Sequence, residues 1–225
     1  MTAAATTSSK AAPDVKGVSK FSAAQQWLAQ SQNRYLAAGV GLALVALIVW
    51  FVALSGQRKE QFASRALDQA RVIAEQGNLP LAASEFQKVI STYGGSTAAQ
   101  EAVINLNQVR LINGQQELAA VNLQDFLKSK PAPQFRAPAY SLLGRALENA
   151  GRHGDAAEAY LNASKVAEFD YLKADLLLDA ARAYANGGQR DKAVEAYRGV
   201  IKDFPKTSSK VEAEVRLAEL TAGQM

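Results

Sequence analysis

The feature that most restricts the fold of this chain is a pattern of glycine and alanine that returns every 37 residues. Four alanines lie in this register, at Ala82, Ala119, Ala156 and Ala193. Four glycines share it five residues earlier, at Gly77, Gly114, Gly151 and Gly188. A fixed period of this length is typical of stacked supersecondary units, so the sequence predicts a solenoid.

Residues 184–205, YANGGQRDKAVEAYRGVIKDFP, indicate what one unit contains. Gly187 and Gly188 are expected to supply the positive φ that ends a first helix. Ala193 is small enough for two helices to cross closely, and Pro205 stops the second helix. A helix pair this short cannot bury its own apolar face, which is why several pairs must stack.

Two segments carry a more specific pattern of large apolar, small and aromatic residues around a turn, in residues 140–163 and 177–205. The first segment contains Tyr140, Leu143, Gly144, Leu147, Ala156, Tyr160 and Ala163. This pattern resembles the tetratricopeptide repeat family over roughly residues 62–205, with two less regular units at the start. The resemblance implies an all-α, right-handed α-solenoid, which we expect to form four helix pairs over residues 57–225. Ser209 and Glu212 have the spacing of a capping box and predict one further, capping helix.

A second strong feature precedes the repeats, where residues 36–54 contain no charge, amide or hydroxyl group. As a helix this run is about 28 Å long, close to the thickness of a bilayer's hydrocarbon core. We therefore expect a transmembrane helix over residues 36–56, with Tyr35, Trp50 and Phe51 at the interfaces. A buried core helix and a cleaved signal peptide are the alternatives, but the segment before the run is too long for a signal peptide.

The residues before this run divide into two parts. Residues 1–20 have almost no large apolar side chain and are expected to be a disordered tail. Residues 21–35 place aromatic side chains, among them Trp27, near one helical face and predict an amphipathic segment at the membrane surface. An unstructured lead-in with incidental aromatic residues is the alternative.

Composition argues against catalysis. The chain has no cysteine and a single histidine, His153, which we expect to be exposed in an interhelical turn. No glycine-rich phosphate loop is present. Of the net charge of +4, residues 1–35 contribute +3, so the repeats are nearly neutral, which disfavours nucleic acid as their partner. We expect no enzymatic activity, cofactor, metal or small-molecule substrate.

Candidate partner-binding residues recur on the first helix of each unit. They are Arg71, Gln108, Arg145 and Arg182, followed on the same helices by Asn149 and Asn186. In the tetratricopeptide family these positions line a concave groove, and the arginine fork suits a carboxylate or a carbonyl. The alternative is that the arginines form ion pairs between repeats, with Asp175, Asp179 or Glu148.

The order of tail, aromatic segment, apolar helix and degenerate repeats resembles the YfgM-like family of ancillary subunits of the bacterial SecYEG translocon. The motif is QQWLAQSQNRYLAAGVGLALVALIVWFVAL. The resemblance implies a single-pass inner-membrane protein with a cytoplasmic N-terminus and periplasmic repeats. Its partners would be protein clients, chaperones or an integral membrane complex. A permanent structural subunit of a large membrane complex, for example an energy-transducing one, is the alternative, and an enzyme is the third hypothesis.

Overall fold

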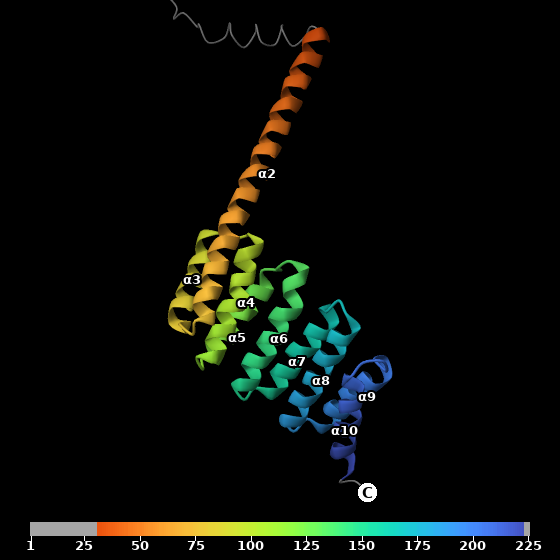
Figure 1. Cartoon of the computed structure of the whole chain (residues 1–225). Coiled ribbons are helices and arrows are strands. Elements are labelled where there is room, and N and C mark those ends of the chain that lie inside the picture. The colour runs from red at the N-terminus through yellow and green to blue at the C-terminus, as the bar shows by residue number, and fades with distance from the viewer. Residues whose placement is uncertain (1–30, 223–225) are drawn as a thin grey trace, which may run out of the picture. The chain divides into compact units, whose positions relative to one another are not determined.

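The computed structural model describes residues 31–222, and within that range it consists of helices joined by short turns, with no strand (Figure 1). The predicted tail and amphipathic segment up to residue 30, including Trp27, lie outside the described residues. The helices are α2 (Ser31–Glu75), α3 (Leu79–Thr92), α4 (Thr97–Ile112), α5 (Gln116–Lys128), α6 (Pro133–Asn149), α7 (His153–Val166), α8 (Asp170–Asn186), α9 (Arg190–Asp203) and α10 (Ser209–Thr221).

The chain divides into two compact units, residues 1–55 and 56–225. In the first unit the structure describes residues 31–55, which belong to α2. In the second unit the last turns of α2 pair with α3, and α4 with α5, α6 with α7 and α8 with α9 follow, with α10 at the end. The prediction of an all-α solenoid with four helix pairs and a capping helix is therefore confirmed.

The glycine register forms the turns within the pairs. Gly77, Gly114, Gly151 and Gly188 have φ values of 81°, 71°, 74° and 70°. This left-handed conformation suits a residue without a Cβ. The prediction was wrong for Gly187, whose φ is −85° because it caps α8, with its N–H donating to the carbonyl of Ala183. One positive-φ residue is enough to reverse the chain here.

The alanine register lies at the helix crossings. The four alanines of the register are fully buried, and the large residue four positions later is at most 2% exposed in every unit. Gly144 shows how close the helices come, because a Cβ there would lie 2.7 Å from the ring of Tyr160. Small side chains on one helix thus leave room for a ring on the other.

The capping helix begins without the predicted capping box. Ser209 is the first residue of α10 rather than its N-cap, and the preceding Ser208 makes no capping hydrogen bond. The Ser209 hydroxyl instead donates to a carboxylate oxygen of Asp175 on α8. This bond fastens α10 to the preceding first helix, a contact that local sequence spacing does not reveal.

The beginning of the second unit is fastened by two polar side chains of α2. The carboxylate of Glu60 accepts hydrogen bonds from the N–H groups of Thr97 and Ala98, at 2.8 and 2.9 Å. Lys59 Nζ donates to the carbonyl of Gly94 at 2.7 Å. Since a carboxylate is favourable at a helix N-terminus, Glu60 stabilises the start of α4 and its packing on α2.

Candidate binding surface on the first helices

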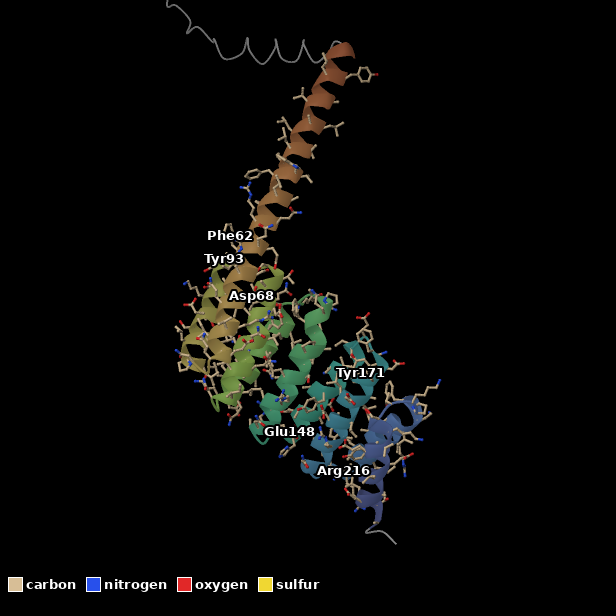
Figure 2. All side chains as sticks on the ribbon, in the orientation of Figure 1. Phe62, Asp68, Tyr93, Glu148, Tyr171 and Arg216 are labelled. Atoms are coloured by element: carbon tan, nitrogen blue, oxygen red, sulfur yellow. The ribbon has the colours of Figure 1, made fainter. Side chains whose placement is uncertain are left out.

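The predicted binding residues all belong to one set of helices. We call the surface formed by residues 56–75 of α2 together with α4, α6, α8 and α10 the first-helix face. Arg71 lies on α2, Gln108 on α4, Arg145 and Asn149 on α6, and Arg182 and Asn186 on α8. All are exposed except Arg71, which is half-buried. Figure 2 shows the side chains of this unit, with Glu148 and Arg216 labelled.

Two of the three arginines form ion pairs. Arg71 contacts Asp68 at 3.5 Å and also pairs with Glu101 on α4, so this pair joins two repeats. Arg182 pairs with Asp179 within α8 rather than between repeats. Arg145 has no carboxylate within ion-pair distance among residues 31–222. The ion-pair hypothesis thus describes part of the arrangement: Asp179 is a partner as expected, but within one helix, and the pair between repeats joins Arg71 to Glu101.

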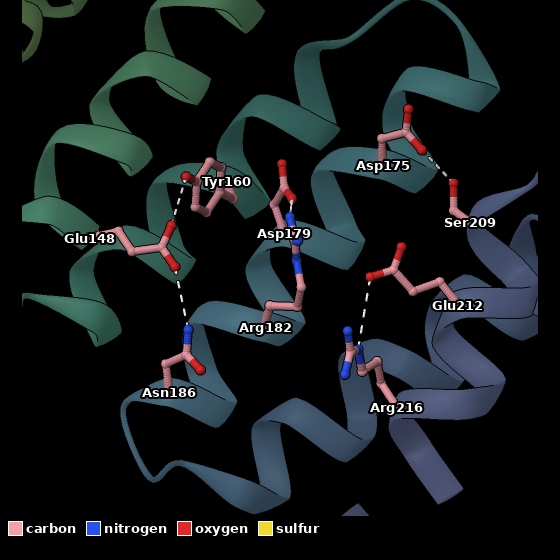
Figure 3. A network of polar contacts seen from close by, with 9 residues as sticks. All are labelled: Glu148, Tyr160, Asp175, Asp179, Arg182, Asn186, Ser209, Glu212 and Arg216. Carbon is pink, nitrogen blue, oxygen red and sulfur yellow. Dashed lines mark hydrogen bonds and ion pairs between the residues drawn. The ribbon is translucent and has the colours of Figure 1, made fainter. Parts of the chain in front are cut away.

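Glu148 is the centre of a polar network across α6 and α8 (Figure 3). Its carboxylate accepts a hydrogen bond from the Tyr160 hydroxyl at 3.1 Å and one from Asn186 Nδ2 at 3.5 Å. Burial and the nearby carboxylate of Glu148 raise the pKa of Tyr160, so the hydroxyl stays a donor. Glu148 therefore joins a second helix and the next first helix through one side chain.

The network continues along α8 toward α10. Burial raises the pKa of Asp179 above its ordinary value, against the opposing effect of the Arg182 guanidinium. On α10, Arg216 lies 3.9 Å from Glu212 and 3.1 Å from Glu219. These exposed pairs are screened by water, so each contributes little stability and can be exchanged for another partner.

Two hollows open on the first-helix face, one toward each end of the solenoid. The α2–α4 hollow, of about 350 Å³, is lined by Arg71, Ala74, Glu75, Leu79, Phe86, Asn105, Gln108, Val109 and Ile112. The α8–α10 hollow, of about 410 Å³, is lined by Arg182, Ala185, Asn186, Tyr197, Arg216, Glu219 and Leu220. Each of these seven residues lies 111 positions, or three periods, after a residue of the first hollow.

The size of the side chain at one position of the 37-residue register, residues 74, 111, 148 and 185, explains why the two hollows remain open. This position carries Ala74 and Ala185 in the two hollows, and Leu111 and Glu148 at the steps between them. Leu111 packs against the larger apolar core, and Glu148 reaches Asn186 on the next first helix. An alanine has no side chain long enough to cross this space, so the face stays open there.

Sequence reasoning identified Arg71, Gln108, Arg182 and Asn186, which line the hollows, but not the residues that shape them. Arg145 and Asn149 lie between the hollows. Tyr197, Arg216 and Glu219 were missed as parts of a site, and so was the bridging role of Glu148. The order Ala74, Leu111, Glu148 and Ala185 at 37-residue steps, with a short side chain at each end, could have indicated the hollows.

His153 differs from its prediction as an exposed turn residue. It is the first residue of α7 and half-buried. Its Nδ1 is buried and has no hydrogen-bond partner within residues 31–222. Over the same residues no group of three or more His, Cys, Asp or Glu side chains is placed to hold a metal ion.

The apolar part of α2 is long and apolar enough to cross a membrane, by length and composition, and is consistent with a single-pass anchor. None of its apolar window is buried against other described residues. Of the predicted interfacial residues, Tyr35, Trp50 and Phe51 are exposed by 81%, 62% and 68%. Such exposure of large apolar side chains needs a covering that water does not provide.

Comparison with known proteins shows where this architecture recurs. The family model for the tetratricopeptide repeat-like domain matches residues 25–222. A crystal structure of MamA is similar over 72% of this chain and 82% of that chain, with a TM-score of 0.57 and 22% identity. No curated protein matches the chain in sequence.

Two further crystal structures share the fold. PilW, described as a widely conserved type IV pilus biogenesis factor, is 24% identical over 81% of this chain and 79% of its own, with a TM-score of 0.53. YrrB, described as a tetratricopeptide protein with an unusual peptide-binding site, is 15% identical over 71% of this chain and 76% of its own, also with a TM-score of 0.53. At such identities the likeness shows the fold.

Proposed function

Because the chain belongs to the tetratricopeptide repeat-like domain family, we propose that it is a non-catalytic, membrane-anchored module for protein–protein interaction. Residues 36–56 form the transmembrane helix, residues 57–225 the interaction domain, and residues 1–20 and 21–35 the tail and the interfacial segment. The observation that carries the proposal is the first-helix face, with its two open hollows and the exposed donors around them.

In this proposal the partner lies along the first-helix face and contacts Arg71, Gln108, Arg145, Asn149, Arg182 and Asn186. The peptide-binding site named for YrrB supports such a use of the fold. The ion pairs of Arg71 and Arg182 do not prevent binding, because both guanidinium groups are partly exposed and an arginine has further N–H donors for a partner's carboxylate or carbonyl.

The biological setting that we propose is a translocon-associated, chaperone-like role or a role in envelope assembly. The first follows from the YfgM-like layout of the chain, and the second is supported by the pilus biogenesis role named for PilW. Both place the N-terminus in the cytoplasm and the repeats in the periplasm. The short basic tail favours retention on the inner side, and a long domain can be translocated despite its charges.

Site-specific photocrosslinking in native membranes tests the binding face. A photoreactive amino acid replaces Gln108, Asn149 or Asn186, and a matched control replaces Val121, which is exposed on the second helix α5. We expect one set of partner crosslinks from the three face positions and not from position 121. Equal crosslinking from position 121 would contradict the proposal.

Purification in mild detergent separates the chaperone-like role from that of a permanent subunit. A chaperone-like protein should copurify below stoichiometry and exchange with added protein, whereas a fixed subunit should be stoichiometric. Orientation is tested by adding protease to intact spheroplasts. Digestion of the repeats with survival of the tail is expected, and repeats that survive until the membrane is broken would reverse the orientation.

A further inference from the structure

The bridge made by Glu148 has no internal counterpart one repeat later. In the third pair, Tyr160 on α7 donates its hydroxyl to Glu148 on α6. One period on, Tyr197 on α9 takes the place of Tyr160, but Ala185 takes the place of Glu148. The register position that supplies the acceptor for Tyr160 therefore supplies none for Tyr197.

Tyr197 has a buried ring but a hydroxyl that solvent reaches, since the hydroxyl is not among the buried polar atoms without a partner. Its residue is 2% exposed and it lines the α8–α10 hollow. Within residues 31–222 its hydroxyl has no hydrogen-bond partner, whereas the hydroxyls of Tyr160 and Tyr184 bind Glu148 and Glu158. Since Tyr197 lines the hollow, a ligand there can accept the hydrogen bond of the hydroxyl in place of water.

The other polar side chains around this hollow are mainly donors. Arg182 and Arg216 each present a guanidinium, Asn186 presents an amide, and Glu219 is the one acidic residue of the lining. The side chains of Arg182 and Arg216 are both 49% exposed, and the pairs of Arg216 with Glu212 and Glu219 are screened by water, whereas the Asp179 partner of Arg182 is half-buried. Guanidinium groups and a hydroxyl converging on one space suit a carboxylate.

We propose that the α8–α10 hollow binds the side-chain carboxylate of an acidic residue on a partner segment, which takes the place that Glu148 holds one repeat earlier. This inference rests on the proposed function and assigns the chemistry of one of its contacts. A side chain is the expected source because the chain's own equivalent, Glu148, is a glutamate side chain. Tyr197 and Arg216 then join Arg182 and Asn186 as binding residues.

The α2–α4 hollow has a different lining and provides the internal comparison. Phe86 replaces Tyr197, Asn105 replaces Arg216, and Glu75 replaces Asn186. Its lining therefore has no hydroxyl and one cation fewer, and its donor without a partner among the described residues is the buried Nδ2 of Asn105. With one guanidinium instead of two, this hollow should bind a carboxylate more weakly than the α8–α10 hollow.

Peptide binding to the full chain in detergent micelles tests the inference. The probes are three fluorescent alanine-rich peptides: one with blocked ends and a central Glu, one with Gln in its place, and the Gln peptide with a free C-terminal carboxylate. Since a hydrogen bond to a charged group contributes about 1.5–3 kcal/mol, the Glu peptide should bind about tenfold more tightly than the blocked Gln peptide. Fluorescence anisotropy gives the affinities.

Three variants assign the effect to this hollow. Tyr197→Phe should remove most of the preference for Glu, and Tyr160→Phe, the matched control, should keep it. Ala185→Glu places a carboxylate of the chain in the hollow and should abolish the preference. Circular dichroism checks that each variant is helical. If Ala185→Glu fails to fold, Tyr197→Phe still tests the inference, because it removes only one oxygen atom.

Several results would overturn the inference: equal affinity for the blocked Glu and Gln peptides, no binding of any peptide, or a preference that survives in Tyr197→Phe. Tighter binding of the free C-terminus than of the Glu side chain would overturn the assigned source. If photocrosslinks from Asn149 and Asn186 still identify a partner, only the carboxylate site is wrong. If these crosslinks are also absent, the proposed function fails with it.

Discussion

The two hollows of the first-helix face are built on the same backbone but differ in chemistry. Both lie where the register carries alanine, at Ala74 and Ala185, and both are bordered by an arginine of the first helix. The α2–α4 hollow has apolar walls, with Phe86, Leu79 and a 70% exposed Ile112. The α8–α10 hollow presents a hydroxyl and two guanidiniums.

This difference shows how a repeat fold separates the position of a site from its specificity. Stacking of equivalent helices produces equivalent spaces, and the side chain at one register position decides whether a space is filled. A few further positions then decide what it can hold. An extended partner could place an apolar side chain at one end of the face and an acidic one at the other.

The largest expected effect tests whether the same close helix crossing recurs in the units at both ends of the solenoid. Ala82→Leu and Ala193→Leu each insert a bulky side chain at a fully buried helix crossing. Each should lower the free energy of unfolding by about 1–3 kcal/mol through overpacking, and Ala156→Leu should do the same in the middle. Thermal unfolding followed by circular dichroism measures this, and unchanged melting temperatures would mean that the assigned register is wrong.

The next effect compares the hydroxyl of Tyr160, which has an acceptor in the protein, with that of Tyr197, which has none among residues 31–222. Tyr160→Phe removes the hydrogen bond to Glu148 and should cost about 1–2 kcal/mol. Tyr197→Phe, in the equivalent place, removes no hydrogen bond within the described chain and should leave the stability of the unliganded protein nearly unchanged. Chemical unfolding measures both variants. An equal loss of unfolding free energy in the two would contradict this difference between Tyr160 and Tyr197.

A smaller effect should follow when the apolar hollow is filled. Ala74→Leu reproduces at the first end the residue that Leu111 provides one repeat later. Partial burial of the added methylenes should stabilise the protein by about 1 kcal/mol and reduce photocrosslinking from Gln108, while crosslinks from Asn186 remain. Loss of both sets of crosslinks would argue that the two hollows are not separate contacts.

The smallest effect is a pH dependence at Asp179. Burial raises its pKa in the folded protein, so the folded state takes up this proton before the unfolded state does as the pH falls. The resulting stability is present below the ordinary pKa and is lost as the pH rises through the raised value. The melting temperature of the wild type should therefore rise relative to that of Asp179→Asn between about pH 7 and about pH 4. A constant or falling difference would contradict the raised pKa.

Much of the fold could be predicted because its causes are local. Gly77, Gly114, Gly151 and Gly188 take the left-handed conformation wherever the register places them, since a turn between two short helices needs one such residue. The face that carries Arg71, Gln108, Arg145 and Arg182 follows from the same period. The errors at Gly187 and Ser209 arose where several local solutions exist and packing selects one.

The sequence by itself determined the number of helix pairs, their turns, the capping helix and a helix apolar enough for lipid, because each depends on residues close together in the chain. Only the tertiary structure decided that Glu148 joins Tyr160 to Asn186, that Ser209 binds Asp175, and that the Tyr197 hydroxyl has no acceptor within residues 31–222. A hydrogen bond forms or fails within a few tenths of an ångström. That spacing is decided by how neighbouring helices pack, not by the residues adjacent to each donor.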